Sequence, residues 1–150
     1  MIVEREDIVK APAEVIWKTC FENLEFDKWD PDLKEITNKS SLKCENGTKL
    51  TFIMKDGNQL PMELSNVEEN KSMTFAGGVL MGAMFGIGTF VLTPVDDDAN
   101  KTKVVYTFEL KGCLGALLSF FNKAAVINGT EHGLENVKQL SEKAQAEGQY

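Results

Sequence analysis

The spacing of apolar residues changes twice along the chain. Residues Ile2–Val9 alternate loosely between apolar and polar side chains and are followed by Ala11-Pro12, which predicts a strand that leads directly into a helix. Apolar residues then recur at helical spacing from Pro12 onward. They predict a first helix there and a second short helix over residues 23–28. Trp29-Asp30-Pro31 ends that helix, because the residue before a proline avoids helical backbone angles.

The middle of the chain has the two-residue period of β-strands. Short turn sequences such as Glu45-Asn46-Gly47 and Asp56-Gly57-Asn58 separate the segments, which predicts antiparallel pairing of consecutive strands. In the last segment Val104, Tyr106 and Phe108 fall on one face, so one side of the sheet is expected to meet an apolar interior and the other to meet water. The segments of strand length are residues 33–42, 48–55, 59–67, 72–76, 83–93 and 103–111.

Residues 72–95 contain no charged side chain, and Gly78, Gly82 and Gly86 fall four residues apart within them. This stretch is long enough to cross a bilayer, and its glycine spacing lets two membrane helices approach closely. However, it contains five glycines and no Lys or Arg cluster at either end, and residues 85–92 are mostly aromatic and β-branched. We therefore predict two buried strands joined by a Gly-rich bend around residues 77–82, in a protein that does not span a membrane.

The helical period returns in the last part of the chain. No proline occurs between residue 114 and about residue 146, which predicts a helix of roughly 45 Å. Its apolar stripe changes face near Gly129 and Gly133, where a kink costs little. Leu117, Phe121 and His132 fall on the first side of this stripe. One half of the helix is expected to cover the sheet while the other half leans over a different part of the molecule.

Composition limits the range of functions. The 150 residues favour one domain, residues 1–150, with disorder confined to the last few residues. A formal net charge of −7 with scattered Lys and Arg disfavours nucleic acid as a partner. The charged N-terminus lacks the apolar core of a secretion signal, so we expect a cytoplasmic protein. Three distant cysteines and one histidine do not form a ligand set, so we expect free thiols, no metal and no cofactor.

The order of these elements resembles the START-like superfamily, also called SRPBCC. The resemblance rests on the first strand, the Ala-Pro-Ala-Glu-Val-Ile-Trp helix start, Trp29-Asp30-Pro31, the antiparallel strands and the long C-terminal helix, and it covers nearly the whole chain. It implies an α+β helix-grip fold: two short helices after the first strand, then a curved antiparallel sheet wrapped around the long C-terminal helix, with a cavity between them. Members include polyketide cyclases and dehydratases, lipid-transfer domains and plant pathogenesis-related allergens, so the fold alone does not define function.

The expected interior contains adaptable apolar side chains. Methionines cluster in the sheet and serve either as core packing or as the wall of a ligand cavity. Gly86 and Gly88 share the parity of Phe90, and we expect them to leave inward space opposite Phe121. The expected function is to bind an apolar or amphipathic small molecule, lipid-like or polyketide-like, with Tyr106 orienting a polar end. The expected lining residues are Phe52, Met54, Met62, Phe75, Met84, Phe90, Tyr106, Phe108, Leu117 and Phe121.

Two other functions stay open at this point. A cyclase or dehydratase acting on such a ligand would use His132 or Tyr106 for acid–base chemistry, although a lone histidine without a partner is more often structural. The sequence leaves open whether His132 faces the cavity. A protein-interaction module would instead have a collapsed cavity and an exposed apolar patch around Phe120, Ala124 and Ile127. The ligand, the oligomeric state and the pathway are not defined by the sequence.

Overall fold

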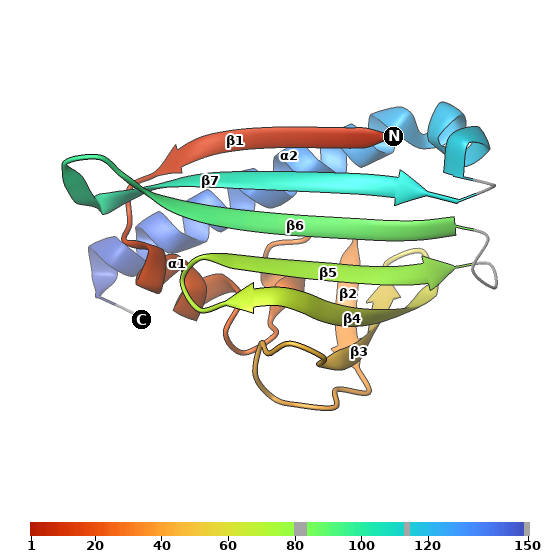
Figure 1. Cartoon of the computed structure of the whole chain (residues 1–150), viewed down its shortest axis with the longest axis horizontal. Helices are drawn as coiled ribbons and strands as arrows, with labels where there is room; N and C mark the ends of the chain where they lie inside the picture. Colours follow the sequence, from red (N-terminus) through yellow and green to blue (C-terminus); the bar gives the residue numbers. More distant parts are fainter. Residues whose placement is uncertain (80–83, 113–114, 149–150) are drawn as a thin grey trace.

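The computed structural model describes residues 1–79, 84–112 and 115–148, with side chains described for residues 1–78, 85–112 and 123–148. Its strands form one sheet in the order β1-β7-β6-β5-β4-β3-β2, and every neighbouring pair is antiparallel. The elements, shown in Figure 1, are β1 (Ile2–Val9), α1 (Ala13–Cys20), the 3₁₀ helix η1 (Phe26–Lys28), β2 (Leu33–Thr37), β3 (Lys49–Met54), β4 (Gln59–Glu68), β5 (Ser72–Val79), β6 (Met84–Val95), β7 (Asp98–Lys111) and α2 (Gly115–Glu147).

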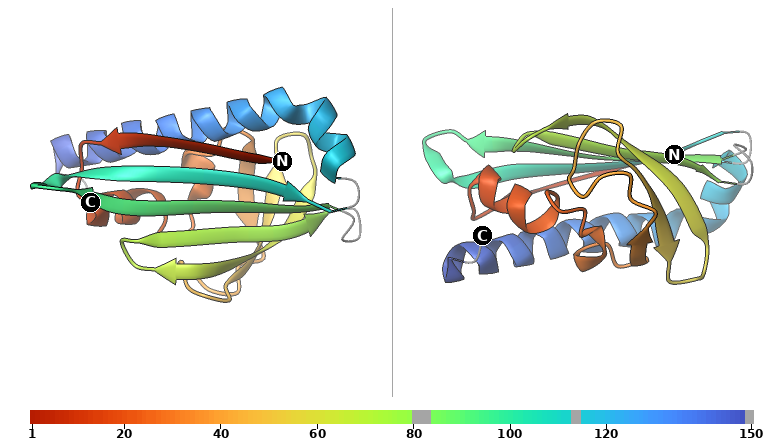
Figure 2. Two further views of the ribbon diagram at one scale, coloured as in Figure 1. Left: turned by 45° about the horizontal axis from the view of Figure 1, so that its top comes forward. Right: turned by 90° about the horizontal axis from the view of Figure 1, so that it is seen from below.

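The predicted α+β helix-grip fold is confirmed. The helix α2 runs along one face of the sheet, and α1 lies beside it at the same face (Figures 1 and 2). Contacts of α2 with β1, β7 and α1 hold the helix in this position. The sheet therefore has an inner face toward the helices and an outer face toward solvent.

Several element boundaries differ from the sequence prediction. The second short helix is only the 3₁₀ turn η1, because Leu24 has a φ of 60°, which is incompatible with a helix over residues 23–28. The strand β2 ends at Thr37 instead of residue 42, since Asn38 has a φ of 53°. The bend predicted at residues 77–82 begins later, because Gly77 pairs with Gly86 in the β5–β6 ladder. Residues 80–83 lie outside the described part of the chain.

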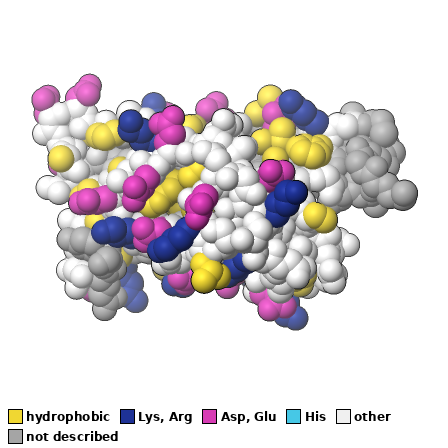
Figure 3. Space-filling model, turned by 60° about the horizontal axis from the view of Figure 1, so that its bottom comes forward, with side chains coloured by type: hydrophobic (Ala, Val, Ile, Leu, Met, Phe, Trp, Pro, Cys, Tyr) yellow, Lys and Arg dark blue, Asp and Glu magenta, His cyan; other side chains and the backbone are white. Residues whose placement is uncertain are grey.

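The apolar stretch 72–95 forms β5 and β6, as predicted. In the part of the chain that the structure describes, no helix combines the length and the apolar character that crossing a membrane requires. The large inner-face side chains of the two strands, Met73, Phe75, Phe90 and Leu92, are buried, whereas Val91 on the outer face is 41% exposed. On the molecular face in Figure 3, acidic and basic side chains are interspersed.

Trp29 is the centre of the core. Its side chain is 1% exposed, and its indole Nε1 donates a hydrogen bond to the carbonyl of Cys20 at the end of α1, at 3.0 Å. Its own carbonyl accepts a 2.9 Å bond from Nδ2 of Asn136 in α2. Its ring lies edge-on to Phe90 of β6 and Tyr106 of β7, with centroid distances of 5.0 and 6.1 Å. One residue thus joins both helices to the sheet.

Gly133 lets α2 approach this core closely. A Cβ atom placed there would lie 3.3 Å from Cε2 of Tyr106 and 3.7 Å from the Trp29 ring. Gly133 and Gly129 both lie inside one helix, Gly115–Glu147. The close packing at Gly133 is a reason for a glycine at this position. The buried face of the helix continues through Thr130, Leu134, Val137, Ser141 and Ala144.

We predict that Trp29→Ala lowers the free energy of unfolding by about 3–5 kcal/mol, because the change removes a fully buried ring and its hydrogen bond. Urea unfolding followed by far-UV circular dichroism measures this loss. Leu42→Ala is the control, since Leu42 is 78% exposed and its truncation should change stability by less than about 0.5 kcal/mol. A loss below about 1 kcal/mol for Trp29→Ala would contradict its role as the anchor of the core.

Candidate functional site

An internal space lies between the inner face of the sheet and α2. It consists of two adjoining pockets of about 180 and about 110 Å³, whose walls share Asp30, Met54 and Phe108. Small-molecule sites have volumes of about 300–1,000 Å³, so the two pockets together approach the lower end of that range.

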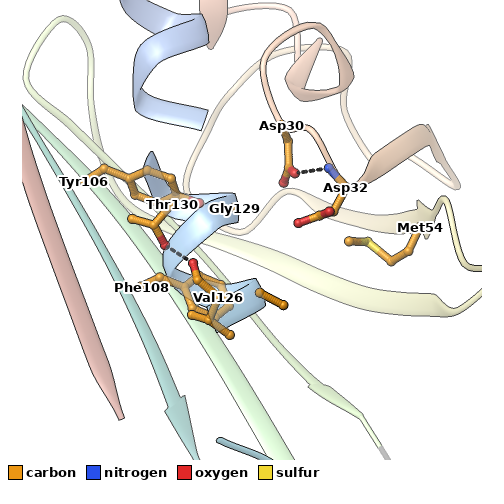
Figure 4. A pocket seen from close by; sticks show the side chains of 9 residues that line it. Asp30, Asp32, Met54, Tyr106, Phe108, Val126, Gly129 and Thr130 are labelled. Carbon is orange, nitrogen blue, oxygen red and sulfur yellow. Dashed lines mark hydrogen bonds between the residues drawn. The ribbon is translucent and has the colours of Figure 1, made fainter. Parts of the chain in front are cut away.

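The larger pocket lies under one turn of α2. Val126, Gly129 and Thr130 of that turn face Tyr106 and Phe108 of β7 across the pocket (Figure 4). Its remaining wall is formed by the loop between η1 and β2 and by the end of β3. The pocket opens to solvent beside two of its lining residues, Asp32 and Ala125, which are exposed.

The smaller pocket lies deeper along the sheet and has almost only apolar walls. Asp30 is its single charged lining residue among those described. Two glycines, Gly77 and Gly86, contribute no side chain to it. The other lining residues come from β3, β4, β5 and β7 and are Phe52, Met54, Leu60, Met62, Phe75, Phe108 and Leu110.

Backbone hydrogen bonds fix the loop that carries Asp30. The N–H groups of Trp29 and Asp30 both donate to the carbonyl of Phe26, at 3.2 and 2.9 Å. The carbonyl of Asp32 accepts a 2.9 Å bond from the N–H of Lys55, just after β3. The loop is therefore tied to η1 on one side and to the sheet on the other, which directs Asp30 toward the pockets.

Asp30 has its carboxyl group at the junction of the pockets, and Asp32 adds a second carboxyl group to the larger one. The Asp30 carboxylate accepts a hydrogen bond from the N–H of Asp32 at 2.9 Å (Figure 4). Asp commonly forms this kind of turn, in which its side chain bonds the backbone two residues further on. Burial raises the pKa of Asp30 to about 6, and the negative charge of Asp32 adds to this, while the hydrogen bond from Asp32 and the charge of Lys55 oppose it. Among the residues that the structure describes, neither carboxylate forms an ion pair.

Tyr106 supplies the third polar group. Its side chain is 4% exposed, and its ring stacks on Phe90 at a centroid distance of 4.1 Å. Burial, together with the charges of Asp30 and Asp32, raises the pKa of Tyr106 well above its usual value, so the phenol stays neutral. Tyr106 lines the larger pocket. The nearby Thr130 hydroxyl donates to the Val126 carbonyl at 2.8 Å (Figure 4).

The structure places several of the predicted site residues around this space. Phe90 is an exception: it lies behind Tyr106, packed against Phe21 at a centroid distance of 4.9 Å, and is 1% exposed, so it belongs to the core. The side chains of Met84, Leu117 and Phe121 are outside the described part of the chain. Those predicted residues that do line the two pockets are Phe52, Met54, Met62, Phe75, Tyr106 and Phe108.

His132 lies on the exposed surface of α2 and lines neither pocket, so it is not placed to act with Tyr106 on a molecule held there. Of the apolar patch that the interaction alternative names, Ala124 is exposed and Ile127 is half-buried. Phe120 lies outside the described side chains. Among the described residues, no group of three or more His, Cys, Asp and Glu side chains is arranged to hold a metal ion.

The sequence prediction missed Asp30 and Asp32 as site residues. It used Trp29-Asp30-Pro31 only as the end of a helix. The position of Asp30 between a tryptophan and a proline could have indicated a site residue. A tryptophan is expected in the core, and the residue next to it in sequence must then lie close to the core as well. Leu60 and Leu110 were also missed as lining residues, although both have the correct inward parity.

The two inward glycines of β6 differ from each other. A Cβ atom at Gly88 would lie 2.1 Å from the ring of Phe75, so that ring already fills the space beside Gly88. The expectation that Gly88 leaves inward space is therefore wrong. A Cβ atom at Gly86 would lie 3.5 Å from the Phe108 ring, an ordinary contact distance. Gly86, and not Gly88, therefore borders the smaller pocket.

An antiparallel sheet that holds a long helix across an apolar space defines a protein of the helix-grip class. Residues 1–142 match the model of a family described as polyketide cyclase/dehydrase and lipid transport, and the chain belongs to this family. The resemblance to the START-like superfamily is thus confirmed. No curated protein matches the sequence significantly.

Solved structures share the fold at low sequence identity. A hypothetical protein from Helicobacter pylori has a TM-score of 0.77 at 13% identity, over 94% of this chain and 88% of that one. A protein from Mesorhizobium loti has a TM-score of 0.70 at 18% identity, over 95% and 98% of the two chains. The di-domain ARO/CYC protein BexL, from the BE-7585A biosynthetic pathway, has a TM-score of 0.70 at 14% identity, over 96% of this chain and 47% of BexL.

We predict that Gly88→Ala lowers the free energy of unfolding by about 1–3 kcal/mol, because the added methyl group overlaps the Phe75 ring. The matched control is Gly86→Ala on the same strand and face, which should cost less than about 0.5 kcal/mol. Thermal and urea unfolding of both variants measure the difference. Equal stabilities of the two variants would show that Phe75 does not occupy the space beside Gly88.

We predict that Asp30→Asn stabilises the protein at pH 7.5 by roughly 1–3 kcal/mol and has little effect near pH 4. The folded-state pKa of Asp30 is raised from 3.8 to about 6, so its contribution to stability is fully present below about pH 4 and is lost as the pH rises through about 6. The asparagine oxygen still accepts the N–H of Asp32. Unfolding curves between pH 4 and 8 test this, and a difference independent of pH would contradict it.

Proposed function

We propose that this protein binds an apolar or amphipathic small molecule, lipid-like or polyketide-like, between its sheet and α2. The observation that carries the proposal is the pair of adjoining pockets, one lined almost entirely by apolar side chains and the other ending in Asp30, Asp32 and Tyr106. Membership of a polyketide cyclase/dehydrase and lipid-transport family supports the same class of ligand. The apolar part of the ligand would occupy the smaller pocket, with its polar end in the larger one.

The walls of the smaller pocket suit a ligand of variable shape. Met54 and Met62 contribute flexible thioether side chains that repack at low cost. Gly86 leaves one side of the pocket without a side chain. Each buried methylene of a ligand contributes about 0.8 kcal/mol, so a short alkyl chain is sufficient for measurable affinity.

A second candidate function is acid–base chemistry on the bound molecule, as in a cyclase or dehydratase. One observation favours it: a carboxyl group whose pKa of about 6 suits proton transfer, Asp30, lies at the pockets with the neutral phenol of Tyr106. Asp30 would then take the role that the sequence prediction gave to His132. Turnover of a polyketide-like substrate that is lost in Asp30→Asn would distinguish catalysis from binding alone.

The binding proposal can be tested with the methionines of the protein itself. In ¹³C-methyl-methionine protein titrated with 1-octanol, the Met54 and Met62 signals should shift saturably, because both residues line the smaller pocket. Met73 is fully buried in the core and lines neither pocket, so its signal should stay in place. If the three signals respond alike, or none responds, the protein does not bind the alcohol in this space.

A pair of variants on β6 provides the control. Gly86→Leu places a side chain into the smaller pocket and should weaken octanol binding at least about tenfold, which corresponds to about 1.4 kcal/mol. Ile87→Leu changes the opposite face of the same strand at constant volume and should leave binding unchanged. Equal binding by both variants would contradict the proposed position of the ligand.

A further inference from the structure

The sheet divides between β4 and β5, next to the smaller pocket. The ladder between these two strands ends at the pair Glu63–Ala76. Beyond this pair, β4 still pairs with β3, and β5 still pairs with β6. The described residues 59–62 and 77–79 form no ladder with each other, and the start of β4 curves away from β5 (Figure 2, right). At this end, the strands on the two sides of the division are therefore held only by their other neighbours.

Pro61 explains why the ladder ends where it does. The N–H of Leu64 donates to the carbonyl of Thr48, just before β3, at 2.9 Å. Because the direction of the N–H groups alternates along a strand, the N–H of residue 63 and the corresponding position of residue 61 face β5. Residue 61 is a proline and has no N–H to donate. The sequence thus removes a ladder hydrogen bond at the point where the two strands separate.

A groove of about 490 Å³ lies over this division on the outer face of the sheet. Thr51, Pro61 and Phe85 are among its lining residues, and their side chains have the parity that points away from the core. The smaller pocket lies on the inner face at the same place. Met62 and Gly77 line both the groove and the smaller pocket. The two spaces therefore meet at these two residues.

The side chain of Met62 closes the division. A Cβ atom placed on Gly77 would lie 2.3 Å from Sδ of Met62 and 2.1 Å from the carbonyl oxygen of Pro61, so the thioether lies directly against the backbone of β5. Met62 is only 7% exposed, so the closure is nearly complete. Methionine is unbranched and has three rotatable side-chain bonds, so it changes rotamer more readily than a β-branched residue. Rotation of this one side chain would join the groove to the smaller pocket.

We propose that the ligand enters and leaves the smaller pocket through the sheet, from the outer groove and past the side chain of Met62. This inference rests on the proposed binding function and adds to it the route by which the ligand exchanges with solvent. The outer groove is the mouth of this route, and Met62 is its gate.

The charges at the two openings favour the route through the sheet. The opening beside Asp32 and Ala125 leads past the carboxylates of Asp32 and Asp30 before it reaches the smaller pocket. An apolar molecule that enters there displaces water from charged groups, which is unfavourable. Among the described lining residues of the outer groove, the charged ones are Lys49 and Glu63, which pair across β3 and β4 with opposite charge. An apolar molecule approaching the groove therefore meets no net charge.

The exchange rates of 1-octanol test the route. Line shapes and relaxation dispersion of the Met54 ¹³C-methyl signal give the Kd and both rate constants, since Met54 lines the smaller pocket. Ala76→Trp on β5 and Thr51→Trp on β3 each place an indole over the groove. Both variants should lower the association and dissociation rate constants at least about tenfold and change Kd less than about twofold, because obstructing a path leaves the free and bound states as they were.

Val91→Trp is the matched control. Val91 lies on the same outer face, in β6, is 41% exposed and lines neither the groove nor the two pockets, so an indole there should leave both rate constants unchanged. Met62→Ala tests the gate itself and should raise the association rate constant at least about fivefold, whereas loss of a wall contact alone acts mainly on dissociation. Urea unfolding shows whether each variant is folded.

The outcomes separate this inference from the proposed function. If 1-octanol binds the wild type but both groove variants exchange as fast as Val91→Trp, the route through the sheet is refuted while the binding function stands. Slower exchange in Ala125→Trp would then place the entrance beside Asp32. An unchanged association rate constant in Met62→Ala would refute the gate. If 1-octanol does not bind the wild type, the proposed function itself fails, and the inference fails with it.

Discussion

The packing of Trp29 against both helices and the sheet determines where every other part of the site lies. Its indole N–H is bonded to the end of α1, its carbonyl is bonded to Asn136 of α2, and its ring contacts β6 and β7. A helix can approach so closely only where it lacks a side chain, which is why α2 has Gly133 at this contact. The contact fixes the distance between helix and sheet, and the pockets lie on one side of it.

The same anchor explains how an acidic group comes to lie at an apolar cavity. Asp30 follows Trp29 directly, and its N–H is bonded to the Phe26 carbonyl, so it cannot move to solvent without disturbing the core residue beside it. Retaining a partly buried carboxylate, whose pKa is raised to about 6, costs stability at neutral pH. Such a cost is typical of functional sites, where a group serves binding or chemistry and not folding.

The fold was predictable because apolar residues recur at the regular spacing of strands and helices along the chain. The alternation in β7 correctly directed Tyr106 and Phe108 inward, and the turn sequences correctly predicted antiparallel neighbours. The site was predictable only in part, since it depends on which side chains meet across strands and loops. Phe75 pairs with Gly88 and fills the space beside it, which the glycine alone does not reveal. Asp30 enters the site through the Trp29 anchor, a tertiary contact that no local pattern contains.

Native mass spectrometry of the freshly purified protein tests most directly whether the space between sheet and helix holds a small molecule. The account predicts a population whose mass exceeds that of the 150-residue polypeptide by one small organic molecule, and which is replaced by an octanol adduct when 1-octanol is added in excess. A spectrum that contains only the bare polypeptide, and that shows no octanol adduct at saturating concentration, would contradict the account.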